Sequence, residues 1–359
     1  MNNSMISFCS KAFDLTAQQG QYVNTAFYGA YLLSIPFAML MSKIGYKGTL
    51  ILGLAVAGIG FVINSIGINS AIAAQANVYT VFLASMCLVA CGVVMLQNVA
   101  NPYVMVLGSP EKGAFRMTLS QALNSVATTL APLFITYVII RGQDPEPSAV
   151  PAPFLGLGIF TLAICVILVF LKLPKIDEGK QAEDAGIHRE YKSSVFKYPH
   201  VWLGALGIFM YMGVEIGVPS MLPYKFRDML GAGEDYTSIA TSYLAFYWGG
   251  MMVGRFIGAA ILAKFEPRKL LTSCLVLGAA CILLSVVLPG MVGIWCMIAA
   301  GLFHSVMWPL IFNLGLQELG PHTKSATGVI NTGVIGAALL MPVMGKLVDS
   351  TSVIVASCC

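Results

Sequence analysis

Ten long apolar stretches dominate this sequence, and each is long enough to cross a lipid bilayer as one helix. A hydrocarbon core about 30 Å thick needs about 20 helical residues. The predicted spans are residues 21–43, 48–67, 78–107, 117–140, 153–173, 200–222, 238–263, 268–289, 290–316 and 325–347. Because unpaired backbone groups are costly in lipid, this pattern predicts an all-α polytopic membrane protein.

The composition supports the same fold class. Charged residues make up 10% of the 359 residues, whereas a soluble domain carries about 25%. Hydrophobic residues make up 57%, and the mean hydropathy is +0.81. A soluble enzyme, a disordered chain or a nucleic-acid-binding protein needs more charge, so these classes are excluded and the expected surrounding is a lipid bilayer. The nine cysteines show neither a zinc-site spacing nor a secreted disulfide framework.

Residues 174–199 form the one long charged stretch, and they separate five predicted spans from five others. We therefore predict an N-terminal helix bundle at 1–173, a linker at 174–199 and a C-terminal helix bundle at 200–359. The linker is expected in the cytoplasm, because the loops on its side carry most of the 20 Lys and Arg residues. Both chain ends would then lie outside. This predicts an incomplete span at each end, within residues 1–10 and 352–359.

The two bundles repeat each other in sequence. Residues 96–108 align with 303–315 at a constant offset of 207, and Asn124 and Asn331 keep the same offset. A second repeated segment aligns residues 42–47 with residues 263–268, at the corresponding place in the second bundle. Parallel repeats joined by a cytoplasmic linker are typical of transporters in which two bundles rock around a central substrate.

Several short segments are typical of one transporter family. They are Asn24–Tyr31, Ala100–Gly108, Phe115–Ser125, Gly254–Gly258, Trp308–Gly315 and Pro342–Gly345. Taken together, the chain resembles the fucose/glucose–galactose permease-like branch of the major facilitator superfamily, whose members are sugar:cation symporters. The resemblance implies two pseudo-symmetric bundles, with about ten complete spans here and partial first and twelfth spans.

Four amides occupy two neighbouring predicted spans. Gln97 and Asn101 are four residues apart and share one side of a helix, and Gln121 and Asn124 are three apart on the next span. An unpaired amide in hydrocarbon costs several kcal/mol, so these side chains should face protein or water. They either bond neighbouring helices or bind a hydroxyl-rich substrate, and four together favour a sugar site. In the family, the pair on the fifth span faces the substrate.

Three ring-bearing residues are further candidates for substrate binding. Tyr28 and Trp308 lie in family-like segments, and such rings stack on the apolar face of a sugar. His304 precedes Trp308 by four residues and is either a substrate ligand or a neutral, hydrogen-bonded histidine. Packing within the bundle is the alternative for the two aromatic residues.

Two charged positions inside spans are candidates for ion coupling and gating. Glu215 is the one acid deep within a complete span, so we predict that it carries the coupling cation. Its alternative role is a structural partner for a neighbour such as His304. Arg255 must find a partner or reach the interface, and with Lys43 and Lys47 of the loop after the first predicted span it is a predicted gating residue. Substrate binding is the alternative role of Arg255.

One departure from the family pattern bears on the substrate. The fucose-permease branch links protons to acids in its first and fourth spans, but here the fourth-span position is Gln97 and the first-span position falls near Asn3. Neither is ionisable. This favours a neutral hexose such as glucose or galactose, with coupling through Glu215 or sodium, or with no coupling at all.

We therefore predict a secondary active transporter, not an enzyme, that takes up a neutral hexose by cation-coupled alternating access. The alternatives are a drug or other organic-solute transporter of the same fold, or an inactive truncated fragment. We expect a monomer in a bacterial inner membrane, with a sugar and the bilayer as partners. No nucleic acid, metal or cofactor is expected apart from a coupling proton or sodium ion.

Overall fold

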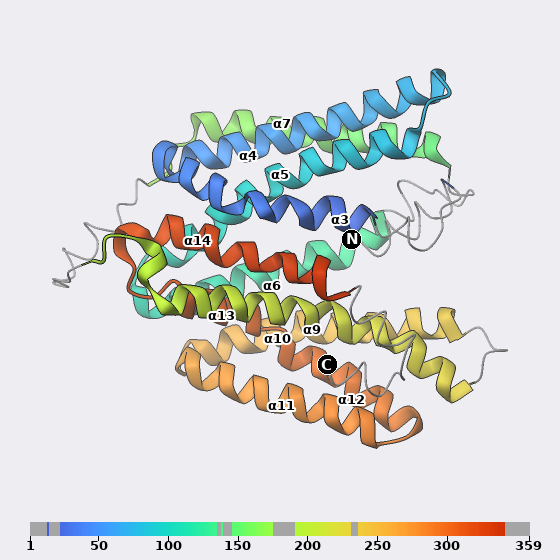
Figure 1. The fold of residues 1–359 in the computed structure, drawn as a ribbon, viewed down its shortest axis with the longest axis vertical. Coiled ribbons are helices and arrows are strands. Elements are labelled where there is room, and N and C mark those ends of the chain that lie inside the picture. Colours follow the sequence, from blue (N-terminus) through green and yellow to red (C-terminus); the bar gives the residue numbers. More distant parts are fainter. Residues whose placement is uncertain are drawn as a thin grey trace. The chain divides into compact units, whose positions relative to one another are not determined.

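The computed structural model describes residue 13 and residues 22–134, 138, 146–174, 191–230 and 236–341 (Figure 1). Within these residues the regular elements are all helices. The α-helices are α3 (Tyr22–Gly29), α4 (Ser34–Ala73), α5 (Val78–Val106), α6 (Gly113–Phe134), α7 (Pro151–Phe170), α9 (Pro199–Leu230), α10 (Tyr236–Leu262), α11 (Pro267–Val287), α12 (Gly290–His304), α13 (Met307–Gly315) and α14 (Thr323–Thr332). The short 3-10 helices are η1 (Ala30–Leu33), η2 (Pro110–Lys112), η4 (Pro147–Ala149), η5 (Val195–Lys197), η6 (Gly320–His322) and η7 (Gly333–Ile335). The all-α prediction is confirmed.

Seven helical segments of the described residues are long and apolar enough to cross a membrane. The described parts of the ten predicted spans are largely helical, whereas residues 342–347 and the predicted partial spans at 1–10 and 352–359 lie outside the described residues. One clear difference in boundaries is at α4. This element joins the end of the first predicted span to the whole of the second across Gly45, whose φ of 74° and ψ of 178° are not helical. Glycine adopts a positive φ at little cost because it lacks a Cβ, so Gly45 turns the chain between two spans without a longer loop.

The predicted span 290–316 matches one membrane-length segment, Gly290–Gly315, which consists of two helices. Helix α12 ends at His304 and α13 begins at Met307. Pro309 lies in the first turn of α13, where a proline is tolerated because its missing N–H would lack a helical partner there. The hydroxyl of Ser305, at the break, donates to the backbone oxygen of Leu302 at 2.6 Å. The break places polar backbone atoms of Ser305 inside the bundle.

Contacts group the chain into two compact units. Unit 1 comprises Met1–Tyr103, Ala127–Val195 and Leu319–Thr332, and unit 2 comprises Val104–Val126, Phe196–Glu318 and Gly333–Cys359. Each unit therefore contains a helical segment from the other half of the sequence: α14 packs within unit 1, and most of α6 packs within unit 2. The predicted division at 174–199 stays a prediction, and residues 175–190 lie outside the described residues.

Each unit has its own apolar core. In unit 1, Phe82 and Phe154 pack with Ile68, and Gly92 allows α5 to approach the backbone of α4 closely. In unit 2, Phe226, Tyr247 and further residues of α9, α10 and α12 form the larger cluster.

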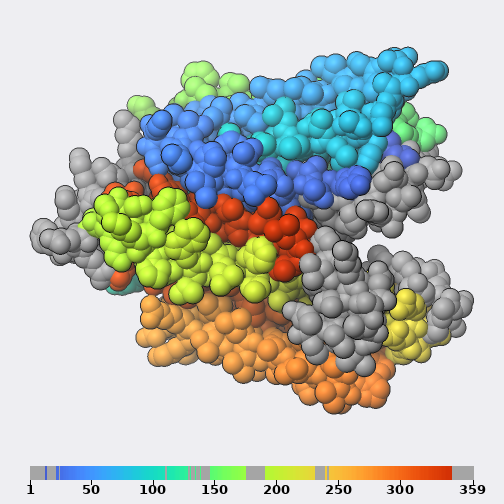
Figure 2. Space-filling view, in the orientation of Figure 1, coloured from blue at the N-terminus to red at the C-terminus, as the bar shows by residue number. Residues whose placement is uncertain are grey.

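The outer surfaces are apolar as well. Helix α11 forms an outer surface of unit 2 (orange in Figure 2), and Val276, Leu283 and Val287 are among its exposed side chains. Helix α7 of unit 1 likewise exposes Phe160 and Phe170. In water such surfaces would drive association, whereas lipid is their natural solvent, which agrees with a multi-pass membrane protein.

Candidate functional site

A buried ion pair lies in the middle of unit 2. Nη2 of Arg255, on α10, is 3.5 Å from Oε1 of Glu215, on α9, and the two side chains are only 13% and 15% exposed. Both residues lie inside segments that can cross a membrane. The structure thus supplies the partner that an intramembrane arginine requires, and that partner is Glu215.

The guanidinium of Arg255 has further partners on two other segments. Its Nε donates to the backbone oxygen of Ser305 at 3.2 Å, and its Nη1 donates to the hydroxyl of Ser125 on α6. Ser125 belongs to the first half of the sequence but packs within unit 2. We call Ser125, Arg255 and Ser305 the charged junction. It ties α6 to α10 and to the break between α12 and α13.

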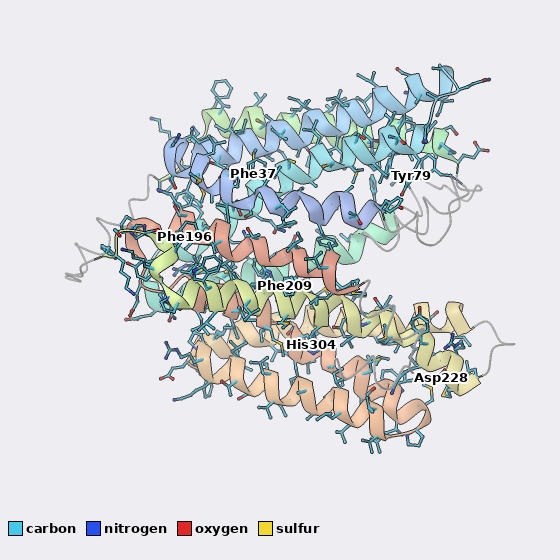
Figure 3. The ribbon with its side chains drawn as sticks, in the orientation of Figure 1. Phe37, Tyr79, Phe196, Phe209, Asp228 and His304 are labelled. Carbon is cyan, nitrogen blue, oxygen red and sulfur yellow. The ribbon has the colours of Figure 1, made fainter. Side chains whose placement is uncertain are left out.

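His304, which is labelled in Figure 3, belongs to a hydrogen-bond network beside the ion pair. Its Nδ1 shares a 3.0 Å hydrogen bond with the hydroxyl of Tyr247, and its backbone oxygen accepts from the hydroxyl of Tyr211 at 3.0 Å. The Tyr247 hydroxyl also lies 3.5 Å from the backbone oxygen of Glu215. The side chain of His304 is 2% exposed and bonds to Tyr247, which favours the interpretation as a hydrogen-bonded histidine.

A second polar cluster lies in unit 1 and contains no charge. The Ser34 hydroxyl donates to Oδ1 of Asn98 at 2.9 Å, and Nδ2 of Asn98 returns a bond to the Ser34 backbone oxygen at 2.9 Å. Nδ2 of Asn331, on α14, donates to the same Oδ1 at 2.7 Å. All three residues are buried. We call Ser34, Asn98 and Asn331 the neutral junction, which ties α14 to α4 and α5.

The four predicted sugar-binding amides are divided between the units. In unit 1, Gln97 accepts a 2.8 Å hydrogen bond from the Tyr31 hydroxyl, and Asn101 is 7% exposed. In unit 2, Gln121 is half-buried and Asn124 is exposed. Their part in substrate binding stays a prediction.

The predicted aromatic residues are divided in the same way. Tyr28 lies next to Tyr31 in unit 1, with ring centroids 6.4 Å apart, so it adjoins the residue that bonds Gln97. Trp308 stacks on Phe312 in unit 2, with centroids 5.1 Å apart and an interplanar angle of 13°. Sequence reasoning placed both residues near a sugar and did not detect Tyr31, whose spacing of three from Tyr28 was the available signal.

The two predicted gating lysines differ in their surroundings. Nζ of Lys47 donates to the backbone oxygen of Val169, at the end of α7, at 2.8 Å. Lys43 is exposed. Among the described residues, no group of three potential metal ligands comes together.

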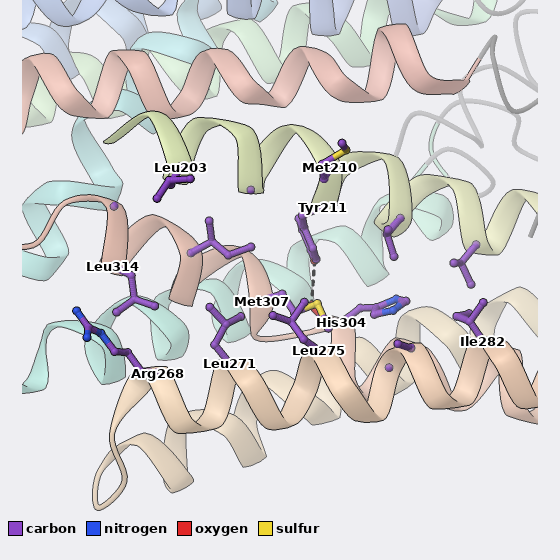
Figure 4. Close-up of a pocket in the computed structure, with 18 of the residues that line it drawn as sticks. Leu203, Met210, Tyr211, Arg268, Leu271, Leu275, Ile282, His304, Met307 and Leu314 are labelled. Atoms are coloured by element: carbon purple, nitrogen blue, oxygen red, sulfur yellow. Dashed lines mark hydrogen bonds between the residues drawn. The ribbon is translucent and has the colours of Figure 1, made fainter. Parts of the chain in front are cut away.

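An apolar groove of about 730 Å³ lies within unit 2, between α9, α11 and the α12–α13 segment (Figure 4). Leucine, isoleucine, valine and methionine side chains form most of its lining, and Tyr211, His304, His200 and Arg268 contribute the polar side chains. None of the four predicted amides lines it. A hexose needs several hydrogen bonds for its hydroxyl groups, so this groove does not meet the requirements of the predicted sugar site.

The sequence repeat explains the groove. In unit 1, the corresponding face of α4 is covered by α7, since a Cβ on Gly158 would lie 2.9 Å from Val62 and 3.2 Å from Phe61. The offset of 221 between residues 42–47 and 263–268 carries Phe61 and Val62 to Ile282 and Leu283, which line the groove. The groove therefore lies where the first half of the repeat seats a membrane-spanning helix, and its lining suits hydrocarbon.

Comparison with known proteins identifies the family. Residues 1–342 match the Major Facilitator Superfamily model. The chain is 35% identical over 359 residues to the glucose/galactose transporter of Brucella abortus biovar 1 (strain 9-941), covering 98% of this chain and 84% of the relative. It is 28% identical over 376 residues to the L-fucose-proton symporter of Escherichia coli (strain K12), covering 98% of this chain and 83% of the relative.

A solved structure agrees with these relatives. The E. coli fucose:proton symporter superposes with a TM-score of 0.82 at 25% identity, over 99% of this chain and 91% of that one. The prediction that the chain is a transporter rather than an enzyme is confirmed, because the family and the relatives are transporters. The chain is a multi-pass membrane protein and belongs to the Major Facilitator Superfamily.

Proposed function

We propose that the protein takes up a neutral hexose, glucose or galactose, across a bacterial inner membrane by cation-coupled alternating access. The observation that carries this proposal is the 35% identity to a glucose/galactose transporter over almost the whole chain. A relative named as a fucose-proton symporter supports the coupling to a cation. The relatives give no support to a drug transporter, and the expected monomer remains part of the proposal.

Glu215 is the proposed ion-coupling residue. Its carboxylate is largely buried and faces Arg255, so a proton or a sodium ion that binds there competes with the guanidinium. A buried ion pair contributes little net stability, because desolvation of both charges offsets their attraction. Such a pair is better suited to switching between two arrangements than to holding the fold together.

The amides are the proposed hydrogen-bonding partners of the sugar. Gln97 and Asn101 on α5 and Gln121 and Asn124 on α6 offer both donors and acceptors without charge, which matches an uncharged hexose. Tyr28, Trp308 and His304 are the proposed ring-facing residues. Because His304 already bonds Tyr247, its contact with a sugar would require a change of partner.

Transport by the purified chain in proteoliposomes tests the proposal. We expect uptake of labelled glucose or galactose that is stimulated by an imposed proton or sodium gradient, and weaker uptake of fucose. Hexose uptake that is equal with and without either gradient would reject the coupling to a cation and would indicate facilitated diffusion. The absence of any hexose uptake would reject the proposed function.

Two substitutions test the sugar site. In Gln121→Ala and Asn124→Ala we expect a loss of apparent sugar affinity of about tenfold or more, because each removes a partner of a sugar hydroxyl. Thr161→Ala on α7 is the matched control, since its hydroxyl bonds only the backbone oxygen of Leu157 in its own helix. Equal affinities in all three variants would contradict the assignment.

A further inference from the structure

Two members of the neutral junction and two members of the charged junction occupy equivalent positions in the sequence repeat. The offset of 207 carries Asn98 to Ser305, and the offset of 221 carries Ser34 to Arg255. The third members differ by one position, because Asn331 on α14 matches Asn124 on α6, whereas Ser125 is the next residue and matches Thr332. In each unit, the junction is the point where a helix from the other half of the sequence is held by hydrogen bonds.

The two junctions differ in the chemical groups that form their hydrogen bonds. In the neutral junction, an amide and a hydroxyl bond each other and Asn331, and no ionisable group takes part. In the charged junction, one guanidinium is shared among the Ser125 hydroxyl, the Ser305 backbone and the carboxylate of Glu215. The orientation of Arg255 therefore depends on whether Glu215 is available as its counterion.

We propose that Ser125 is a positioning residue that makes the docking of α6 depend on the coupling cation at Glu215. The inference rests on the proposed function only in taking Glu215 as the cation site. With Glu215 unoccupied, the carboxylate holds the guanidinium where Nη1 reaches Ser125, and α6 is docked. With a cation on Glu215, the carboxylate no longer holds the guanidinium in place, and α6 is released from the junction.

The energetics favour such a release. A buried guanidinium without a counterion is costly, so Arg255 shifts toward other acceptors or water once Glu215 is neutralised. Its hydrogen bond to Ser125 is charge-assisted and depends on direction, so even a small shift weakens it. The groups next to Glu215 in the described residues are Arg255, Tyr211 and Tyr247, and His304 lies one hydrogen bond further. Of these, Arg255 alone carries a fixed charge that links Glu215 to α6.

Amide hydrogen exchange of the full chain in lipid nanodiscs tests the proposal. The exchange of α6 residues 113–126 is measured with and without the coupling cation, by varying pH and sodium separately, and each rate is divided by the intrinsic rate of an unprotected amide at the same pH. In the unsubstituted chain, we expect the cation to speed exchange about tenfold, the equivalent of one hydrogen bond to a charged group. In Ser125→Ala the exchange should be fast in both conditions. Ser125→Thr, which keeps the hydroxyl, should restore the cation dependence.

The neutral junction provides the control. Ser34→Ala removes a buried junction hydroxyl in unit 1, at the position that the repeat matches to Arg255, and the cation response of α6 should survive it. A response that survives Ser125→Ala would overturn the proposal, and so would the absence of any response in the unsubstituted chain. A response lost in Ser125→Thr as well would assign the effect to packing and reject the role of the hydroxyl.

A transport readout separates this proposal from the function on which it rests. In Ser125→Ala, gradient-driven hexose uptake should fall toward the level without a gradient, while exchange of labelled for unlabelled hexose continues. If the unsubstituted chain moves no hexose but its α6 responds to the cation through Ser125, the junction is supported and the proposed substrate is wrong. If hexose uptake is gradient-driven and equal in both proteins, the junction proposal alone fails.

Discussion

The neutral junction of unit 1 and the charged junction of unit 2 perform the same structural task with different chemistry. Each holds a helix from the other half of the sequence, through Asn331 in one case and Ser125 in the other. The neutral junction is formed by amide and hydroxyl groups, which carry no charge. The charged junction is formed by Arg255, whose counterion is the carboxylate of Glu215. In the proposal, a cation that binds this carboxylate removes the counterion. The repeat thus preserves the approximate place of the contact, while the proposed response to a cation belongs to the charged junction alone.

The largest expected effect comes from removing the counterion of the charged junction. Glu215→Ala leaves Arg255 buried without a partner, which should lower the stability of the protein by about 3–5 kcal/mol. Adding Arg255→Leu should recover most of this loss, because the uncompensated charge is then gone. Thermal unfolding of both variants in detergent measures the effect. Equal or additive losses in the double variant would show that the pair is not coupled.

An intermediate effect is expected at the neutral junction. Asn98→Ala deprives the Ser34 hydroxyl and the Asn331 amide of their shared acceptor, which should cost about 1–3 kcal/mol. The same thermal assay, run with and without the coupling cation, sharpens the comparison. The destabilisation by Asn98→Ala should be the same in both conditions. A cation-dependent loss would mean that the neutral junction also senses the ion.

The smallest effect is expected at the start of α14. Nζ of Lys324 lies 4.9 Å from the centre of the Tyr46 ring, on the α4 side of unit 1. Lys324→Gln should lower stability by about 0.5–1 kcal/mol through the loss of this cation–π contact. Lys43→Gln, at an exposed lysine, is the control and should change stability within about 0.5 kcal/mol. Identical unfolding of the two variants would show that the ring contact does not help to hold α14.

The helical spans could be predicted from the sequence because a bilayer imposes one length on every crossing. The boundaries of these spans could not be predicted, because they depend on the backbone conformation of single residues. Gly45 joins two predicted spans into α4 through its own backbone angles. The predicted span 290–316 agrees with the segment Gly290–Gly315, but that segment consists of two helices that meet at Ser305. Hydropathy is insensitive to both features, because glycine and serine are common inside membrane helices.

Charged residues inside the spans could be recognised from the sequence, but their contacts could not. Glu215 and Arg255 each stood out as a charge inside a span, but their pairing depends on how α9 and α10 pack. Ser125 and Asn98 carry no charge and no unusual spacing, so nothing local marks them. The offset that relates Asn124 to Asn331 was the one available signal, and it indicated equivalent places without revealing which side chains meet there.

The most direct test of the account is hexose transport by Glu215→Gln, which removes the charge and keeps the shape of the side chain. Uptake driven by the coupling gradient is compared with exchange of labelled for unlabelled hexose in the same proteoliposomes. The account predicts that gradient-driven uptake falls to the level seen without a gradient, while exchange persists. Gradient-driven uptake equal to that of the unsubstituted chain would contradict it.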